Sequence, residues 1–132
     1  MKIAYFVTKF PYDQYNAQYL YGGASIASKN LAIAMDKRCH EIDIFTTSID
    51  SCDSHQNVRN ISIHRYGTNH QVLTSNISFG MFYKPLKHNA DIAHVHFDIP
   101  PGPFIGFQYA ALKRIPLVVT YHGDWDEGFG GF

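Results

Sequence analysis

The glycine pair Gly22–Gly23, followed by Ala24, is the first feature of this sequence that suggests chemistry. Glycines let the backbone approach a ligand closely, and the free N–H groups at the start of a helix attract anions such as phosphate. The alternative is a loop that simply needs positive φ angles at these positions. The pair is not a dinucleotide fingerprint, because G-x-G-x-x-G is absent, and the lysine-bearing P-loop is absent too.

His122 is the second candidate, because it directly follows the apolar run PLVVTY over residues 116–121. An imidazole at a strand end can donate a hydrogen bond or exchange a proton near neutral pH. The alternative is a histidine that only caps the strand or lines the edge of the core. Asp124, close to His122, could orient a polyol substrate, or it could belong to an ordinary solvated turn together with Asp126 and Glu127.

His94 and His96 fall on one face of the same predicted strand, two residues apart. Such a pair can bind a metal ion, but no third ligand is evident nearby, so hydrogen-bonded histidines are favoured and we predict no metal site. His96 lies nearer the end of the strand and is the better candidate for a ligand contact. Asp98, in the loop that follows, is placed with His96 in a predicted acceptor-binding group.

Tyrosines crowd the long segment between the first strand and the glycine pair. Their rings could stack on the C–H faces of sugars while their hydroxyls meet the polar rim, or they could pin a long loop onto the domain. We assign them a mixed role and place three of them in the acceptor-binding group: Tyr12, Tyr15 and Tyr21. With His96, Asp98 and Asp124 they complete that group.

The elements that must position these residues follow from the hydrophobic pattern. Short apolar or alternating runs predict strands at residues 2–8, 41–47, 61–66, 91–97 and 116–121, and helical periods predict helices at residues 24–37 and 103–114. Residues 48–60 are polar and predict a loop, whereas residues 76–88 are ambiguous between helix and loop. The first helix is expected to bury Ala24, Ala27, Leu31, Ala34 and Met35, and the ambiguous segment would bury Phe79, Phe82, Tyr83 and Leu86.

This alternation predicts an α/β, Rossmann-like fold: a mainly parallel sheet with helices on both faces. In such sheets the ligand crevice lies beyond the carboxyl ends of the strands. The loop 9–23, the loop 97–103 and the segment starting at His122 all reach that edge. We therefore expect Gly22, Gly23 and His122 to meet there.

Composition limits the possible functions. The chain has 132 residues, enough for a single domain, with 45% apolar and 17% charged residues and a formal net charge of zero. A protein that binds nucleic acid needs a basic face, so nucleic acid is not an expected partner. No apolar run approaches the roughly 18 residues of a membrane span. Cys39 and Cys52 show no metal-binding spacing, which fits a reduced, cytoplasmic setting.

Three stretches resemble family-4-type retaining glycosyltransferases of the GT-B fold: GGASIASKNLAIAMDKRCHEIDIFTT, DIAHVHF and PLVVTYHG. Together with the first strand they cover nearly the whole chain, in the family's order. Two positions depart from the pattern. Ser25 stands where the family often has an acidic residue, and Cys39 replaces the glycine of the turn that ends the helix.

The resemblance implies that Gly22, Gly23 and Ala24 approach the diphosphate of a nucleotide-sugar donor and that His122 contacts the transferred sugar. It implies a hexosyltransferase-type enzyme that needs neither metal nor cofactor. This N-terminal domain would hold a sugar or lipid-linked acceptor, in the cytoplasm or at the membrane surface. A second, nucleotide-binding domain has no counterpart in residues 1–132, so we expect a truncated domain that does not transfer sugar unaided. The alternative is a non-catalytic nucleotide- or sugar-binding subunit of a split glycosyltransferase.

Overall fold

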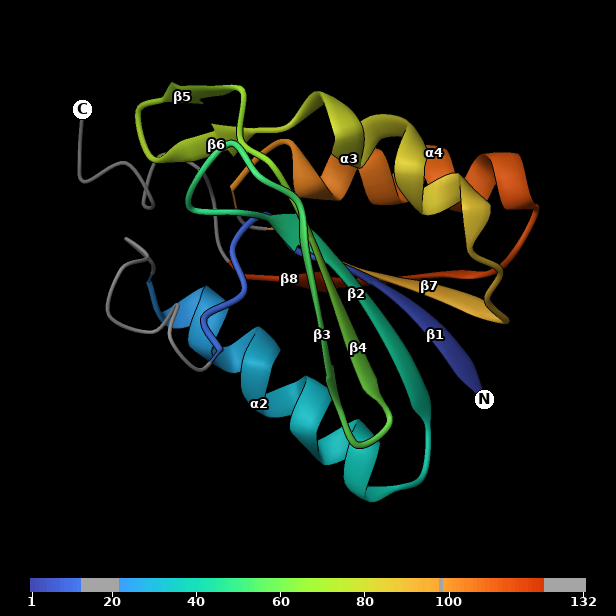
Figure 1. Ribbon diagram of the computed structural model, residues 1–132. Helices are drawn as coiled ribbons and strands as arrows, with labels where there is room; N and C mark the ends of the chain where they lie inside the picture. The colour runs from blue at the N-terminus through green and yellow to red at the C-terminus, as the bar shows by residue number, and fades with distance from the viewer. Residues whose placement is uncertain (13–21, 98, 123–132) are drawn as a thin grey trace.

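The computed structural model describes residues 1–12, 22–97 and 99–122 (Figure 1). The strands are β1 (Lys2–Phe6), β2 (Glu41–Thr47), β3 (Ser54–Val58), β4 (Ile61–Tyr66), β5 (His70–Val72), β6 (Ser75–Ile77), β7 (Ile92–Phe97) and β8 (Leu117–Tyr121). The helices are α2 (Gly23–Lys37), α3 (Phe79–Tyr83), the 3₁₀ helix η1 (Lys84–Lys87) and α4 (Gly102–Lys113). The predicted order of strands and helices is therefore present.

Six strands form one sheet in the order β3-β4-β2-β1-β7-β8. All neighbouring pairs are parallel except β3 with β4. A separate hairpin joins β5 and β6. The predicted α/β class with a mainly parallel sheet is confirmed, and its central strands are apolar because both of their faces are covered.

Helix α2 covers one face of the sheet, and α3 and α4 cover the other (Figure 1). On the α2 face, alternate residues of β1 and β2 pack in one cluster with Ala32 of α2. On the α4 face, the intervening residues Phe6 and Phe45 pack with Tyr109 of α4. Two-residue alternation along the strands thus divides the core into two layers. Within the described residues no helix is long and apolar enough to cross a membrane.

Residues 48–60 were predicted to be a loop, and that prediction is wrong because they contain β3. This edge strand runs antiparallel to β4, with His55 opposite His64 and Val58 opposite Ile61. Its side chains are mostly exposed, so its sequence carries no apolar signal. The main-chain pairing to β4 forms the strand without help from buried side chains.

The predicted apolar stripe of α2 is not its most buried side, although Met35 packs, partly buried, against the core. The residues that face the sheet are Ser25, Ser28, Ala32 and Asp36. These polar residues can be buried because their side chains form hydrogen bonds. Ser28 Oγ donates to Ser25 O at 2.7 Å, and Asp36 Oδ1 accepts from Asn60 N at 3.2 Å. A buried polar group is tolerated when it is hydrogen-bonded, and the hydropathy pattern of the sequence gives no information about such a bond.

The ambiguous segment 76–88 forms three short elements, β6, α3 and η1. Ser78 Oγ accepts from Met81 N and starts α3, and Pro85, which has no N–H, lies in η1. Met81 and Pro85 are buried, whereas the expected stripe residues Phe79, Phe82 and Tyr83 are exposed. The prediction that these aromatic residues are buried is therefore wrong.

Helix α2 ends at Lys37, and Cys39, directly after the C-cap Arg38, has the left-handed φ of 63°. The N–H groups of Cys39 and His40 donate to the carbonyls of Asp36 and Met35 at 2.9 and 3.3 Å, the two bonds of a Schellman motif. The replacement of glycine by Cys39 thus leaves the left-handed cap in place, at a steric cost that glycine would not have.

Candidate functional site at the carboxyl edge of the sheet

Thr8 organises the carboxyl edge of the sheet. Its carbonyl accepts hydrogen bonds from Thr46 Oγ1 at 3.0 Å and Thr47 Oγ1 at 2.6 Å, at the end of β2. Its own hydroxyl accepts from Gly102 N at 2.9 Å and donates to Ile99 O. One buried threonine therefore connects β1, β2 and the start of α4 and holds these segments together at the carboxyl edge of the sheet.

Gly102 begins α4 directly against this threonine. A Cβ at Gly102 would lie 2.7 Å from both Thr8 N and Thr8 Oγ1, a distance that real Cβ atoms do not reach. Arg65 of β4 supports the neighbouring segment, because its buried guanidinium donates to Phe10 O at 2.8 Å. Sequence reasoning missed Thr8 and Arg65, since neither belongs to a motif and their partners lie far away in the chain.

The glycines at the start of α2 have a different environment. Gly22 is the N-cap, with an extended backbone (φ −111°, ψ −169°), and no side chain caps the helix. A Cβ on Gly22 or Gly23 would meet none of the described atoms within 4 Å. Gly22 therefore does not serve a positive φ angle, and neither glycine fills a packing need. Gly22 offers the first N–H groups of α2 no side-chain cap, and free N–H groups at a helix start are a place where anions bind.

A row of histidines lies beneath this helix on the α2 face of the sheet. The rings of His94 and His96 stack with centroids 4.7 Å apart, and both contact the ring of Tyr5 at 5.1 and 4.5 Å. Tyr5 Oη donates to Ser28 O of α2 at 2.5 Å. Tyr5 thus connects the early part of α2 to the histidine row.

His122 completes the row through a hydrogen bond of 2.9 Å between its Nε2 and His96 Nδ1. Its half-buried ring stacks on that of His96, with centroids 5.2 Å apart. His94 is engaged separately, through Nε2 and Thr120 Oγ1 at 2.7 Å. The predicted candidates His96 and His122 are therefore in direct contact, and His94 and His96 are hydrogen-bonded histidines within the sheet.

Burial determines the charge of this row. Desolvation, with smaller contributions from His94 and His122, lowers the pKa of His96 to about 3. Desolvation also lowers the pKa of His94 and of His122. All three imidazoles are therefore neutral at pH 7, and a neutral imidazole has one donor and one acceptor nitrogen. When His96 donates from Nδ1, neutral His122 carries its proton on Nδ1 and remains a donor there.

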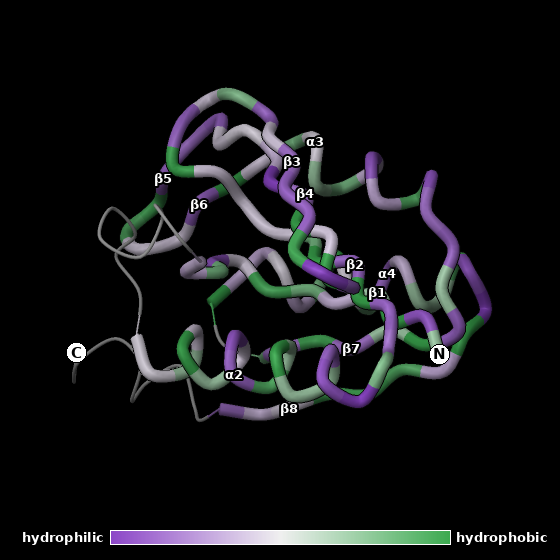
Figure 2. The backbone as a smooth tube through the Cα atoms, turned by 60° about the horizontal axis from the view of Figure 1, so that its bottom comes forward, coloured by the Kyte–Doolittle hydropathy of each residue, from purple (hydrophilic) through white to green (hydrophobic). Residues whose placement is uncertain are grey.

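The start of α2 and the end of β8 lie at the same end of the molecule in both views (Figures 1 and 2). The start of α2 carries Gly22, Gly23 and Ala24, and His122 follows β8 directly. Both groups thus lie toward the carboxyl end of the sheet, and their meeting in one ligand site stays a prediction. Their placement depends on strand order, because β8 pairs with β7 and β7 pairs with β1.

Of the remaining residues predicted for the site, the structure describes only Tyr12. Tyr12 is half-buried, packs against the core of the α2 face and stacks on Phe10 with centroids 6.4 Å apart, as expected for a residue that pins the loop. Tyr15, Tyr21, Asp98 and Asp124 lie outside the described residues. Their assignment to acceptor binding stays a prediction.

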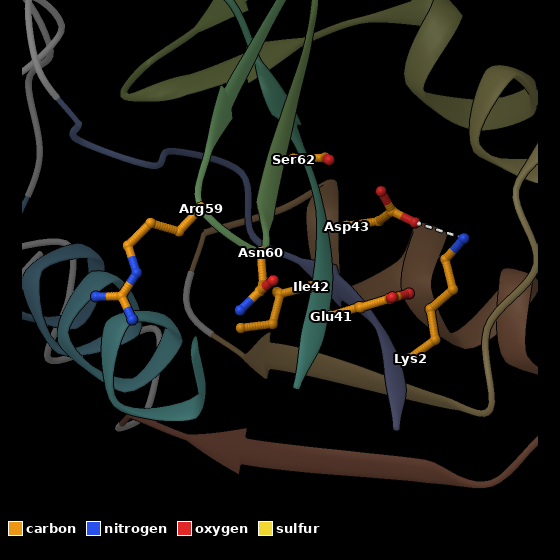
Figure 3. Close-up of a pocket in the computed structure, with 7 residues that line it drawn as sticks. All are labelled: Lys2, Glu41, Ile42, Asp43, Arg59, Asn60 and Ser62. Carbon is orange, nitrogen blue, oxygen red and sulfur yellow. Dashed lines mark ion pairs between the residues drawn. The ribbon is translucent and has the colours of Figure 1, made fainter. Parts of the chain in front are cut away.

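Two clefts lie away from this edge. One, of about 230 Å³, lies near the amino ends of β1 and β2 and is lined by Lys2, Glu41, Ile42, Asp43, Arg59, Asn60 and Ser62 (Figure 3). The other, of about 380 Å³, lies beside β3, β4 and η1. Neither contains any residue that the sequence predicted for the functional site.

The chain belongs to Glycosyltransferase Family 4, whose sequence profile matches residues 21–132. Its fold is similar to part of sucrose-phosphate synthase from Thermosynechococcus elongatus, with a TM-score of 0.58 at 14% identity over 92% of this chain. This chain spans 33% of that synthase. No curated protein sequence matches the chain.

Proposed function

We propose that this domain forms the acceptor side of a glycosyltransferase that moves a sugar from a nucleotide-sugar donor to a sugar or lipid-linked acceptor. The observation that carries the proposal is the placement of a glycine helix start, where a Cβ would meet none of the described atoms, at the same end of a parallel sheet as a hydrogen-bonded histidine. Membership of Glycosyltransferase Family 4 supports it.

The proposed role of α2 is electrostatic. The N–H groups of Gly23, Ala24 and Ser25 would donate to the donor diphosphate, and Gly22 would let that group approach. Negative charge grows on the diphosphate as the sugar leaves, and oriented N–H groups stabilise charge that develops in the transition state. The first turn of α2 contains no acidic residue, so no carboxylate within that turn opposes an anion.

The proposed role of His122 is to hydrogen-bond the transferred sugar. His96 acts as its positioning residue, because the 2.9 Å bond between His96 Nδ1 and His122 Nε2 fixes the plane of the His122 ring. The buried and neutral state of His96 suits this role, since a charged neighbour would repel developing positive charge on the sugar. The proposed reaction uses no metal and no cofactor besides the nucleotide-sugar.

The test is binding of free nucleotide diphosphates and of nucleotide-sugars to the chain, followed through ¹H–¹⁵N amide shifts. Both ligand types should shift the amides of Gly23 and Ala24. Gly22→Val, which places a branched side chain over the helix start, should raise the Kd of both ligand types at least tenfold, equivalent to about 1.4 kcal/mol. His122→Ala should weaken the binding of nucleotide-sugars and leave the binding of free nucleotide diphosphates unchanged.

Gly80→Ala is the matched control, because a Cβ there meets only the flexible end of the Lys84 side chain. It should bind both ligand types like the unchanged chain. Amide shifts confined to other surfaces would contradict the diphosphate assignment. Incubation with a panel of nucleotide-sugars and acceptors should give no turnover, and robust transfer by this chain alone would contradict the expectation that a second domain is needed.

A further inference from the structure

Asp43, His64 and His88 converge on the α4 face of the sheet, opposite the histidine row. They come from β2, from β4 and from the segment just after η1, and one ligand atom from each lies within 4.8 Å of the others. His64 Nε2 and Asp43 Oδ1 are already 3.1 Å apart. No sequence motif indicates this group, because its three residues are about twenty residues apart in the chain.

Two imidazoles and one carboxylate are a ligand set that divalent transition metals accept, Zn²⁺ above all. Around a tetrahedral ion with bonds of about 2.1 Å, neighbouring ligand atoms lie roughly 3.4 Å apart. The Asp43–His64 distance already fits that spacing. Closing the remaining distances needs movements on the order of 1 Å, within the reach of a half-buried side chain such as His88.

The surroundings hold the three side chains near this geometry. The ring of His64 packs against those of Phe45 and His88, with centroid distances of 5.2 and 4.5 Å. The carbonyl of His88 accepts from Tyr109 Oη at 2.7 Å, which ties its backbone to α4. Ligands that are oriented in advance by packing and hydrogen bonds lose little freedom when an ion binds.

Asp43 supplies the second observation that points to a ligand. It is 8% exposed, and its Oδ2 is buried and accepts no hydrogen bond from any described residue. The ammonium of Lys2 lies 3.5 Å from Oδ2 and points toward it from β1 (Figure 3). The Lys2 ammonium offsets the buried carboxylate through this ion pair, and a metal ion bound at Oδ2 would have to displace it.

An ion can reach this position from solvent. His64 and His88 line the cleft of about 380 Å³ beside β3, β4 and η1. Three protein ligands leave a fourth position that water from this cleft can occupy. The position lies on the opposite face of the sheet from His96 and His122, so an ion there does not take part in the proposed sugar transfer.

We propose that Asp43, His64 and His88 bind one divalent transition-metal ion, best suited to Zn²⁺, which links β2, β4 and the segment leading into β7. Each bond forms between a lone pair of a deprotonated ligand and the ion, and any proton displaced goes to solvent. This departs from the expectation of no metal, which rested on the lack of a third ligand beside His94 and His96, on the cysteine spacing and on the family resemblance. The site serves stability, because an ion that binds only the folded chain shifts the equilibrium toward it.

The test is a titration of the metal-free chain with Zn²⁺ by calorimetry and with Co²⁺ by visible absorption. Cys39→Ser and Cys52→Ser are introduced first, because both cysteines are free and exposed and would bind metal themselves. We expect one ion per chain, a Co²⁺ spectrum typical of low coordination number and a higher Tm with Zn²⁺. His88→Ala should weaken Zn²⁺ binding at least tenfold and abolish the shift in Tm.

His70→Ala is the matched control, since His70 is exposed on the β5–β6 hairpin and outside the group. It should bind Zn²⁺ like the parent chain. Should His88→Ala fail to fold, as judged by circular dichroism, His64→Ala replaces it with the same expected loss. Absence of binding at one ion per chain, or equal losses in the His88 and His70 variants, would overturn the proposal.

Discussion

The two helices that begin at the carboxyl edge both start with glycine, yet their glycines serve opposite purposes. At the start of α4, Gly102 is pressed against Thr8, and a Cβ there would collide with backbone. At the start of α2, a Cβ on Gly22 or Gly23 would meet none of the described atoms. The first is a packing glycine and the second pair leaves an open helix end. A glycine in the sequence therefore reveals its role only through what surrounds it.

The same contrast extends to the two sheet faces below these helices. The α2 face carries Tyr5 and a row of neutral histidines that ends at His122. The α4 face carries packed aromatic rings such as Phe6 and Tyr109, 5.1 Å apart. Both faces bury a layer of the core, and the α2 face adds polar groups at its carboxyl edge. We expect substitutions at the packed start of α4 to lower stability and substitutions at the open start of α2 to change ligand binding.

Gly102→Ala should produce the largest effect. The added methyl group must displace Thr8 and disturb the bonds from its hydroxyl, so we expect a loss of about 3 kcal/mol in the free energy of unfolding, measured by urea denaturation. Gly23→Ala is the matched control. It should leave stability unchanged or raise it by roughly 0.5–1 kcal/mol, because alanine is the better helix residue and the space is open. Equal losses in both variants would erase the contrast between the two helix starts.

Acidification should destabilise the chain through the histidine row. The pKa of His96 is about 3 in the folded chain, against about 6.5 for an unperturbed histidine. Between these values the unfolded chain binds the extra proton, so stability falls as the pH falls from about 6.5 toward 3. At pH 5 the expected loss from His96 is about 2 kcal/mol relative to pH 8, measured by urea denaturation at both values.

His96→Asn retains a hydrogen-bonding group and removes the titration, so its stability should depend much less on pH. The exposed His70 offers a control, because His70→Asn should keep the pH dependence of the unchanged chain. A His96→Asn variant with the same acid sensitivity as the unchanged chain would show that the imidazole row is not the buried, neutral array described above.

Cys39→Gly should give the smallest of the three effects, at the far end of α2. Cys39 has a φ of 63°, a conformation that glycine adopts without steric cost. The variant should gain about 1 kcal/mol in the free energy of unfolding, measured by urea denaturation, with no change in ligand binding. His40→Gly, one residue beyond the left-handed position, should bring no such gain. A loss of stability in Cys39→Gly would show that the cysteine side chain makes contacts that outweigh its strain.

The sequence by itself determined the alternation of strands and helices, the parallel α/β class and the places of the glycine pair and His122. These follow from local signals: apolar runs, helical periods and residues at element ends. It misplaced the buried side of α2, because Ser25 and Ser28 are buried through hydrogen bonds that hydropathy does not register. It missed β3, whose side chains are mostly exposed and whose strand exists through main-chain pairing with β4.

Only the tertiary structure decided which groups meet. His96 and His122 are 26 residues apart and become hydrogen-bonded because β7 and β8 pair in a fixed register. The register of β2 with β4 likewise brings His64 to Asp43. The same packing separates Gly102 from the glycines of α2, which look alike in the sequence. Periodicity reports which residues of one segment share a face, but strand order and register determine what that face contacts, and these depend on the whole sheet.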